Sequence, residues 1–203
     1  MRILLLGGGQ QGRAVLYDLA QSPEVEAVTC VEINATPVKK YVDQFGAGKI
    51  QVISLDAEDT ETLGKLMGTG YDVIIDMLPR QYARAIGEAA VEHGIHLVNT
   101  NYDHDLRDLA ATAERAGVTV LPEMGMDPGI DLVLGGEAVR RFDTITKLMS
   151  YGGGFPEAAA VDNPLKYKIT WTWEGVLNSY VRDARIIENG ELVEIPHTDI
   201  FNL

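Results

Sequence analysis

The sequence predicts an α/β fold in which a doubly wound parallel sheet is followed by part of a smaller α+β domain. Three observations predict it. Short apolar runs alternate with amphipathic segments through residue 121, a glycine-rich turn follows the first apolar run, and the pattern becomes β-rich and aromatic afterwards. Continuous apolar strands are typical of parallel sheets, because both faces of such a sheet are buried.

Each expected strand is followed by an expected helix, as in βαβ units. The strands are expected at residues 2–6, 27–31, 50–54, 72–77, 96–99 and 119–121. The helices between them are expected at residues 11–20, 36–45, 59–67, 81–93 and 105–116. Right-handed crossovers between successive parallel strands then place helices on both faces of the sheet.

The remaining sequence, after residue 121, predicts one helix and then β-structure. In "DPGIDLVLGGEAVRRF" we expect Asp127 as the N-cap, Pro128 at the first helical position and Asp131 in the first turn. The segments "TITKLMSYGGGF", "KYKITWTWEGVL" and "ARIIENGELVEIP" predict strands, with Trp171 and Trp173 on one face and a hairpin at Asn189-Gly190.

We place a domain boundary between residues 122 and 123. Residues 1–122 form the expected nucleotide-binding domain, and 123–203 form part of a substrate-binding and dimerisation domain. The second part is small for an independent hydrophobic core.

Composition excludes several classes of function. A formal net charge of −13 argues against nucleic-acid binding through phosphate contacts. The single Cys30 lies in an apolar run and cannot form an internal disulfide, which fits a reducing compartment. The first apolar run is too short to span a membrane. We therefore expect a cytoplasmic protein with no nucleic-acid partner, no membrane partner and no metal site.

The glycine-rich turn predicts dinucleotide binding. Gly7, Gly9 and Gly12 form GxGxxG directly after the first strand and at the start of the first helix, with Gln10 and Gln11 inside the motif. This context is typical of a Rossmann domain, in which the glycines permit a tight turn, close approach to a pyrophosphate and helix–strand packing. The N–H groups at the helix start suit the phosphates.

An acid at the end of the second strand favours NAD as the cofactor. Glu32 lies about twenty positions after the glycine motif, where it can accept hydrogen bonds from both ribose hydroxyls. Ile33 follows it, and no arginine is adjacent to receive a 2′-phosphate. Lys39 and Lys40 lie farther on and keep NADP possible.

Further cofactor contacts are expected just after the later strands, because ligands of open α/β sheets bind at the carboxyl ends of the strands. The residues expected there are Asp56, the group Met77, Leu78 and Pro79, and the group Asn99, Thr100, Asn101 and Tyr102. We expect Asp56 at the adenine edge and the others nearer the nicotinamide.

Several longer motifs resemble one enzyme family. "HLVNTNY", "EMGMDPGID", "SYGGGFPE" and "DNPLKYKITWTWEGVL" are similar to segments of the saccharopine dehydrogenase-like oxidoreductases, which include saccharopine reductases and lysine 6-dehydrogenases. The resemblance implies a Rossmann domain, a second domain that supplies substrate contacts and the dimer interface, and chemistry at a C–N bond. Intact members are roughly twice as long, so we expect a chain truncated at the C-terminus.

The resemblance also implies roles for particular residues. Asp127 holds or deprotonates the reacting amine, and Tyr102 hydrogen-bonds the amine or the attacking water. Tyr167, Glu174 and Gly153 lie against the substrate. The implied partners are a small-molecule amino-acid substrate and a second copy of the chain, in a homodimer or a higher homo-oligomer.

The choice of substrate depends on one position. The saccharopine branch has an arginine where this sequence has Glu174, and an acid there suits an ammonium group instead of a carboxylate. We therefore expect an NAD-dependent enzyme most like lysine 6-dehydrogenase, which deaminates lysine or a related diamino acid oxidatively. "DNPLKYK" looks more like the saccharopine branch, so a saccharopine dehydrogenase or reductase stays open. A truncated, non-catalytic NAD-binding module is the alternative of another class.

Overall fold

The computed structural model describes residues 1–45, 48–169, 173–200 and 202. The chain divides into two compact units, Met1–Gly152 and Gly153–Leu203. No helix among the described residues is long and apolar enough to cross a membrane.

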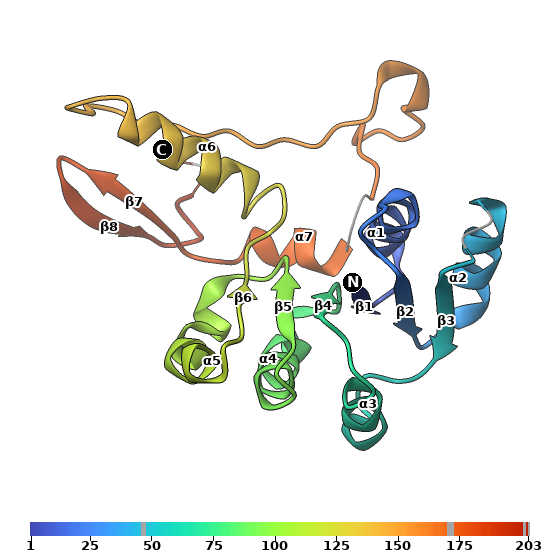
Figure 1. Cartoon of the computed structure of the whole chain (residues 1–203). Coiled ribbons are helices and arrows are strands. Elements are labelled where there is room, and N and C mark those ends of the chain that lie inside the picture. Colours follow the sequence, from blue (N-terminus) through green and yellow to red (C-terminus); the bar gives the residue numbers. More distant parts are fainter. Residues whose placement is uncertain (46–47, 170–172, 201, 203) are drawn as a thin grey trace. The chain divides into compact units, whose positions relative to one another are not determined.

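The first unit contains a six-stranded parallel sheet with the strand order β3-β2-β1-β4-β5-β6 (Figure 1). Its strands are β1 (Arg2–Leu6), β2 (Ala27–Glu32), β3 (Ile50–Ser54), β4 (Val73–Asp76), β5 (His96–Asn99) and β6 (Val120–Leu121). Its helices are α1 (Gln10–Gln21), α2 (Ala35–Val42), α3 (Thr60–Met67), α4 (Ala83–Glu92), α5 (Ala110–Ala116) and α6 (Ile130–Arg140). The predicted α/β fold is confirmed.

Alternate residues of each strand pack into two cores on opposite faces of the sheet. Leu4 and Leu6 lie in one core with Ile86 of α4, and Ile3 and Leu5 lie in the other with residues of α1 and α2. Because both faces are covered, the strands are mainly apolar, which is the pattern that predicts a parallel sheet.

The order of the strands reverses beside β1. Chain connections run from β1 outward to β2 and β3 on one side, and then from β4 outward to β5 and β6 on the other. The loops that leave β1 and β4 therefore turn away from each other. A crevice opens between them at the carboxyl edge of the sheet, where open α/β folds bind ligands.

The bounds of the predicted helices agree with the structure within two residues except in two helices. The segment expected to be helical at residues 36–45 ends at Val42 and continues as one 3₁₀ turn, Asp43–Phe45. The segment expected at 105–116 starts with the 3₁₀ turns Asp103–Asp105 and Arg107–Leu109, and α5 begins only at Ala110. Short 3₁₀ turns are common at helix termini, and composition does not mark them.

The start of α6 differs from the prediction. Gly129, with φ +150°, occupies the N-cap position, and its N–H donates to Asp131 Oδ1 at 2.8 Å. The expected N-cap role of Asp127 is therefore wrong, and so is the expected place of Pro128 inside the helix. A tight turn precedes the helix, with Gly125 N donating to Pro128 O at 2.9 Å.

Strands are absent from the described residues 142–157, so the strand predicted in "TITKLMSYGGGF" is wrong. Three successive glycines lose more backbone entropy on ordering than other residues, which disfavours a strand there. The second unit contains the 3₁₀ turn Ala158–Ala160, α7 (Trp173–Ser179), β7 (Ala184–Glu188) and β8 (Glu191–Ile195).

A helix replaces the strand expected at Trp173. Trp173, Val176, Leu177 and Tyr180 recur at the helical spacing of three and four, which the preceding alternation obscures in the sequence. Trp171 lies outside the described residues. The predicted hairpin is confirmed: β7 and β8 are antiparallel, and Asn189 and Gly190 between them have φ +53° and +85°, as a type I′ turn requires.

Candidate functional site

The glycine turn is held in place by close backbone approaches. Gly7 has φ +92°, and a Cβ on it would lie 3.0 Å from the carbonyl oxygen of Met77. A Cβ on Gly12 would lie 2.1 Å from the carbonyl oxygen of Gly7, so any side chain would push α1 off β1. Both glycines are required by packing within the loop.

Gly9 is different, because it faces open space. It precedes α1 as the N-cap residue, and a Cβ on it would meet no atom within 4 Å. The first N–H groups of a helix have no partner inside the helix and attract anions. Bare backbone beside open space at this place fits a pyrophosphate.

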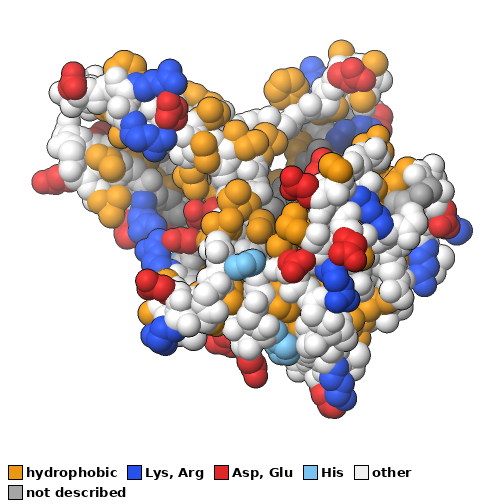
Figure 2. Space-filling view, viewed as in Figure 1, with side chains coloured by type: hydrophobic (Ala, Val, Ile, Leu, Met, Phe, Trp, Pro, Cys, Tyr) orange, Lys and Arg blue, Asp and Glu red, His pale blue; other side chains and the backbone are white. Residues whose placement is uncertain are grey.

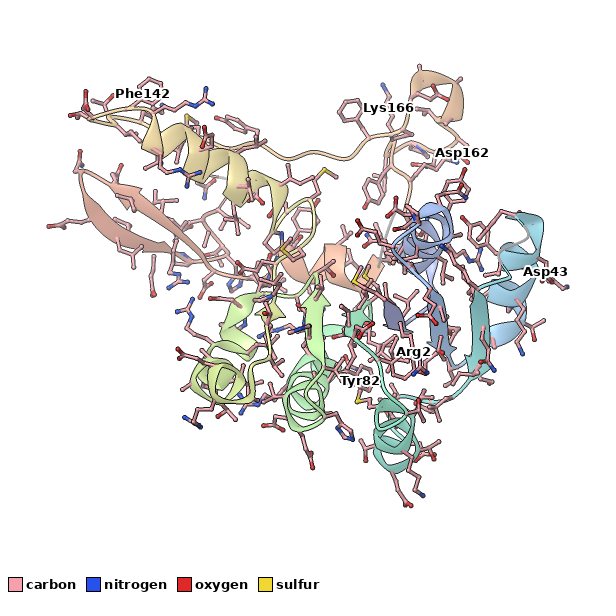
Figure 3. All side chains as sticks on the ribbon, viewed as in Figure 1. Arg2, Asp43, Tyr82, Phe142, Asp162 and Lys166 are labelled. Atoms are coloured by element: carbon pink, nitrogen blue, oxygen red, sulfur yellow. The ribbon has the colours of Figure 1, made fainter. Side chains whose placement is uncertain are left out.

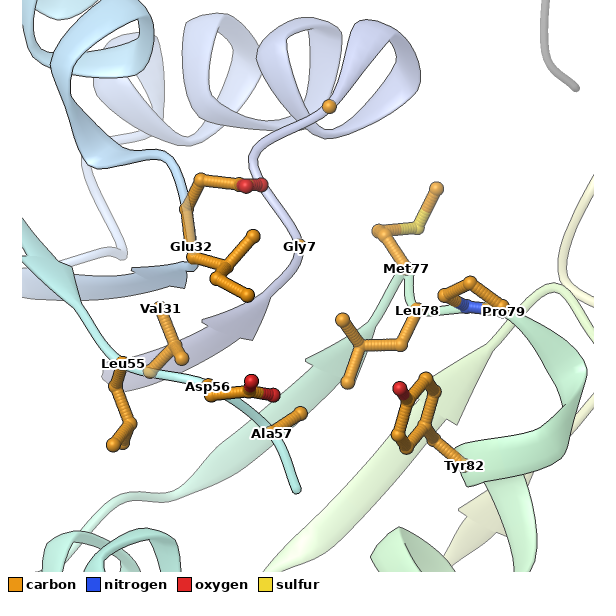
Figure 4. A pocket seen from close by; sticks show the side chains of 12 residues that line it. Gly7, Val31, Glu32, Leu55, Asp56, Ala57, Met77, Leu78, Pro79 and Tyr82 are labelled. Atoms are coloured by element: carbon orange, nitrogen blue, oxygen red, sulfur yellow. The ribbon is translucent and has the colours of Figure 1, made fainter. Parts of the chain in front are cut away.

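A pocket of about 320 Å³ lies at the carboxyl edge of the sheet beside the glycine turn (Figure 4). The residues that line it are Gly7, Gly9, Val31, Glu32, Ile33, Leu55, Asp56, Ala57, Met77, Leu78, Pro79 and Tyr82. The structure thus brings together seven of the residues predicted for the cofactor: Gly7, Gly9, Glu32, Asp56, Met77, Leu78 and Pro79.

The other residues predicted for the cofactor do not line this pocket. Gln10 and Gln11 form the exposed start of α1, and Gly12 packs against Gly7. Asn99 and Thr100 end and follow β5. Thr100 packs beside Gly125, with 3.7 Å between the Thr100 Cβ and a Cβ built on Gly125.

Sequence reasoning missed the apolar walls of the pocket and Tyr82. The missed residues are Val31, Ile33, Leu55, Ala57 and Tyr82. Most of them lie at or next to the strand ends that the apolar runs already mark. Their position beside these ends could have predicted that they line the pocket. Tyr82 fell inside a predicted helix, whereas it closes the 3₁₀ turn Arg80–Tyr82 before α4.

The strands β2, β3, β4 and β5 each lead into the same small turn, in which a side chain at or just after the strand end accepts the N–H two residues on. These hydrogen bonds join Glu32 Oε1 to Asn34 N (3.0 Å), Asp56 Oδ1 to Glu58 N (3.0 Å), Asp76 Oδ1 to Leu78 N (3.0 Å) and Asn99 Oδ1 to Asn101 N (3.1 Å). Three of the four side chains are acids. This edge of the sheet is therefore acidic, and the lining of the pocket contains no lysine or arginine among the described residues.

Glu32 also fixes the glycine turn. Its Oε2 accepts the N–H of Gly8 at 2.9 Å, while its Oε1 holds Asn34. Each carboxylate oxygen can accept a further hydrogen bond. Glu32 can thus accept ribose hydroxyls while it keeps the turn in place.

Tyr82 and Glu58 meet at the open end of the pocket. The Tyr82 hydroxyl donates to Glu58 Oε1 at 3.1 Å, and this hydrogen bond raises the pKa of Tyr82. The ring of Tyr82 lies across the pocket from Leu55 (Figure 4) and on the segment between β4 and α4 (Figure 3). Its flat apolar face and the aliphatic walls suit a planar ring such as a nucleobase.

A buried polar pair lies at the ends of β4 and β5. Asp76 and Asn99 are partners in the parallel ladder and are 0% and 1% exposed. Burial raises the pKa of Asp76 to about 6, against smaller lowering effects of the Leu78 N–H and the nearby Asn99 amide. Within the described residues Asp76 Oδ2 and Asn99 Nδ2 are buried and have no partner in hydrogen-bond geometry.

The segments that follow β5 and β6 are joined to each other. Met124 N donates to Asn99 O and Glu123 N to Asn101 O, both at 2.9 Å. Asp103 N donates to Glu123 Oε1 at 3.1 Å. Tyr102 belongs to this joined region, where its ring stacks on His104 with 5.9 Å between the centroids.

Asp127 lies at the tip of the turn before α6, and its side chain is exposed. Its carboxylate does not cap the helix, since Asp131 takes the Gly129 N–H. Asp127 Oδ2 lies 3.5 Å from a Cβ built on Gly152, so this turn lies next to the last residue of the first unit. The carboxylate of Asp127 is therefore left open to another partner.

The residues predicted to contact substrate belong to the second unit. Gly153 is its first residue, and Glu174 is exposed in the first turn of α7. Tyr167 and Trp173 line a largely apolar hollow of about 480 Å³, with 6.0 Å between their ring centroids. Asn163 Nδ2 donates to Tyr167 O at 2.6 Å, which fixes the turn that presents this ring.

Comparison with known proteins matches both parts of the chain to one family. Residues 3–121 match the family model described as the saccharopine dehydrogenase NADP binding domain, and residues 125–202 match the saccharopine dehydrogenase C-terminal domain. A saccharopine dehydrogenase [NADP(+), L-glutamate-forming] of Schizosaccharomyces pombe is 31% identical over 206 residues, covering 98% of this chain and 44% of the relative. The mitochondrial alpha-aminoadipic semialdehyde synthase of Bos taurus is 30% identical, covering 95% of this chain and 21% of the relative.

Solved structures agree with the sequence matches. An apo saccharopine dehydrogenase (L-Glu forming) from Saccharomyces cerevisiae has a TM-score of 0.79 and 29% identity, covering 99% of this chain and 45% of that one. GenD2 from gentamicin A biosynthesis, solved in complex with NAD, has a TM-score of 0.51 at 18% identity and covers 69% of this chain and 37% of that one, a likeness of fold alone. The chain spans less than half the length of the relatives it matches.

Proposed function

Because this chain belongs to the saccharopine dehydrogenase family, we propose that it carries the dinucleotide site and part of the substrate site of an oxidoreductase that acts on saccharopine. Such an enzyme oxidises the CH–NH group of its amino-acid substrate. The similar relatives described above are named for saccharopine chemistry, which favours this function over the lysine 6-dehydrogenase expected from Glu174.

The pocket between the glycine turn and the β4 exit loop is the observation that carries the proposal. Gly9 leaves bare backbone beside open space, Glu32 offers carboxylate oxygens, and Tyr82 with Leu55 and Ala57 forms walls for a planar ring. These features suit the pyrophosphate, the ribose and the adenine of a dinucleotide, in that order along the pocket.

We propose NAD as the preferred cofactor on electrostatic grounds. Glu32 and Asp56 border the pocket, Asp76 lies beneath it, and Lys39 and Lys40 lie in the last turn of α2, which does not line it. A 2′-phosphate would meet carboxylates here. NADP is the second candidate, because the matched family model and the S. pombe relative carry it in their names.

The proposed chemistry gives roles to Asp127 and Tyr102. Bound nicotinamide would accept a hydride from the carbon of the C–N bond. Asp127, exposed and outside the helix cap, would hold or deprotonate the amine, and its negative charge would stabilise the resulting iminium. Tyr102 would hydrogen-bond the amine or the water that hydrolyses the iminium and releases the amino acid.

Further parts of the proposal concern the second half of the chain. We propose that Tyr167, Glu174 and Gly153 contact substrate, with Glu174 receiving an ammonium group, and that the domain boundary lies between residues 122 and 123. We also propose that the chain forms a homodimer or a higher homo-oligomer through its apolar surface. In support, α6 buries none of its residues, and hydrophobic side chains show on the surface over it (Figure 2). Leu134 in α6 is 64% exposed, and Phe142 beyond it, labelled in Figure 3, is 66% exposed.

The test separates the binding claim from the catalytic claim. NADH and NADPH are titrated into the chain to measure binding. Reduction of NAD⁺ and NADP⁺ is then followed with saccharopine and, as the competing substrate, with lysine. We expect NADH binding and turnover of saccharopine. Turnover of lysine alone would support the lysine 6-dehydrogenase function. Dinucleotide binding without turnover of either substrate would support a non-catalytic NAD-binding module.

A further inference from the structure

The proposed chemistry leaves one buried carboxyl at the crevice without a role. Asp76 is the last residue of β4, and in the sheet it is paired with Leu6 of β1 on one side and Asn99 of β5 on the other. Leu6 directly precedes Gly7. Asp76 therefore lies one residue across the sheet from the turn that would bind the pyrophosphate.

The two oxygens of Asp76 have different surroundings. Oδ1 accepts the N–H of Leu78 at 3.0 Å, and Leu78 and Pro79 line the pocket. Oδ2 is buried with no hydrogen-bond partner among the described residues, and the same holds for the amide nitrogen of Asn99 beside it. A buried carboxylate with an unmet oxygen is costly in a low-dielectric interior.

We propose that Asp76 is a positioning residue of the dinucleotide site, which holds the Met77–Pro79 loop against the glycine turn and takes a proton from solvent when the dinucleotide binds. The inference rests on the proposed dinucleotide function and adds a linkage to it. The positioning part follows from the contacts: a Cβ on Gly7 would already lie 3.0 Å from Met77 O, so any shift of this loop moves the glycine turn as well.

The protonation part follows from charge. Burial already raises the pKa of Asp76 to about 6, and a pyrophosphate next to Gly7 adds negative charge that raises this pKa further. The titratable groups at this edge are the acids Glu32 and Asp56 with Tyr82 in the pocket, Glu58 at the Tyr82 hydroxyl, and Arg80 with His104 beyond Pro79. The acids Glu32 and Asp56 act in the same direction as the pyrophosphate.

The experiment is calorimetric titration of NADH into the chain, near neutral pH, in two buffers of different ionisation enthalpy. The difference between the observed enthalpies counts the protons taken up. We expect uptake of a fraction of a proton, and a Kd about tenfold weaker at pH 8 than near pH 5.5, since a rise of one in the pKa corresponds to a tenfold change in affinity.

Three variants identify the group that takes the proton. Asp76→Asn keeps an oxygen for the Leu78 N–H but cannot ionise, so uptake should vanish and the Kd should become flat across this range of pH. His104→Gln should keep the uptake, although histidine ordinarily titrates in the same range. The exchange of Asp76→Asn with Asn99→Asp restores one acid to the pair and should restore uptake.

Each contrary result has a distinct meaning. NADH binding by the wild-type chain without proton uptake overturns the inference and leaves the proposed function standing. Uptake that persists in Asp76→Asn, or that disappears in His104→Gln, also overturns it. Failure of NADH to bind at any pH removes the proposed function and the inference together. If Asp76→Asn does not fold, the wild-type and His104→Gln titrations still decide.

Discussion

At the scale of single residues, Glu32 combines two tasks that are often separate. Its Oε2 fixes Gly8 at 2.9 Å and its Oε1 fixes Asn34 at 3.0 Å, so the carboxylate organises the turn before any ligand arrives. The same oxygens are the acceptors proposed for the ribose hydroxyls. A ligand can then bind to a site that is already arranged, which lowers the entropy lost on binding.

The double role of Glu32 predicts the effect of its removal. Glu32→Ala should weaken NADH binding by about ten- to a hundredfold, because hydrogen bonds to a charged acceptor contribute about 1.5–3 kcal/mol. NADPH binding should weaken much less, because the carboxylate that repels its 2′-phosphate is lost as well. Fluorescence titration with both dinucleotides measures the ratio, and Glu32→Gln, which keeps one oxygen acceptor, should be intermediate. An unchanged NADH affinity would remove Glu32 from the site.

Asp76 predicts an unusual dependence of stability on pH. Burial raises its pKa from 3.8 to about 6, so between these values the folded state holds more protons than the unfolded state. Its contribution to stability is therefore highest near pH 4 and falls as pH rises to about 6, by up to about 3 kcal/mol. Urea unfolding of wild type and Asp76→Asn at several pH values should show this fall only in the wild type.

The matched control for Asp76 is Asp59, whose pKa is shifted in the opposite direction. Asp59 caps α3 by accepting the N–H of Thr62 at 3.0 Å, and its hydrogen bonds with Thr62 lower its pKa. Stability from Asp59 is thus present above the ordinary pKa and is lost as pH falls. If Asp59→Asn and Asp76→Asn change the pH profile in the same direction, the assignment for Asp76 is wrong.

At the scale of elements, the glycine turn and α1 form a unit in which two glycines have separable tasks. Gly12→Ala should destabilise the chain by more than about 2 kcal/mol, because its Cβ would lie 2.1 Å from Gly7 O and the obstacle is backbone. Gly9→Ala should leave stability nearly unchanged, since nothing lies within 4 Å of its Cβ, and should weaken dinucleotide binding. Thermal unfolding and NADH titration of both variants test the separation; equal loss of stability in both would contradict it.

The elements of the first unit could be predicted because local pattern and buried environment agree. β1, β3 and β5 have the bounds that the apolar runs predict, since most of their buried positions are apolar. The start of α6 and the helix α7 could not be predicted from the sequence. Gly129 with φ +150° replaces Asp127 as the N-cap, and the alternation before Trp173 obscured the helical spacing of Trp173, Val176 and Leu177.

The candidate site was predictable where chemistry follows from position along a strand. Gly7, Gly9, Glu32, Asp56, Leu78 and Pro79 all lie directly after strands and all line the pocket. Tyr82 comes from a 3₁₀ turn between strand and helix, and no local pattern distinguishes that turn from a helix start. The burial of Asp76 needs the neighbouring strands β1 and β5, which only the folded sheet supplies.

At the scale of the whole molecule, the acidic balance of the chain and the acids at the strand ends act in the same direction. The formal net charge is −13, and Glu32, Asp56 and Asp76 lie together at the edge that would bind a dinucleotide. The net negative charge of the chain and the local carboxylates both repel an approaching anion. Favourable contacts with the glycine turn must therefore overcome a repulsion that depends on ionic strength.

That repulsion predicts how salt affects the two cofactors. Raising the salt concentration from roughly 20 mM to about 300 mM shortens the screening length, so binding of both dinucleotides should strengthen. NADPH should gain several-fold more than NADH, because its 2′-phosphate adds nearly two negative charges. Titrations at the two salt concentrations measure the gain, and Glu32→Gln should reduce it. If salt instead weakens NADPH binding, a cation such as Lys39 or Lys40 contacts the 2′-phosphate, and the proposed preference for NAD is wrong.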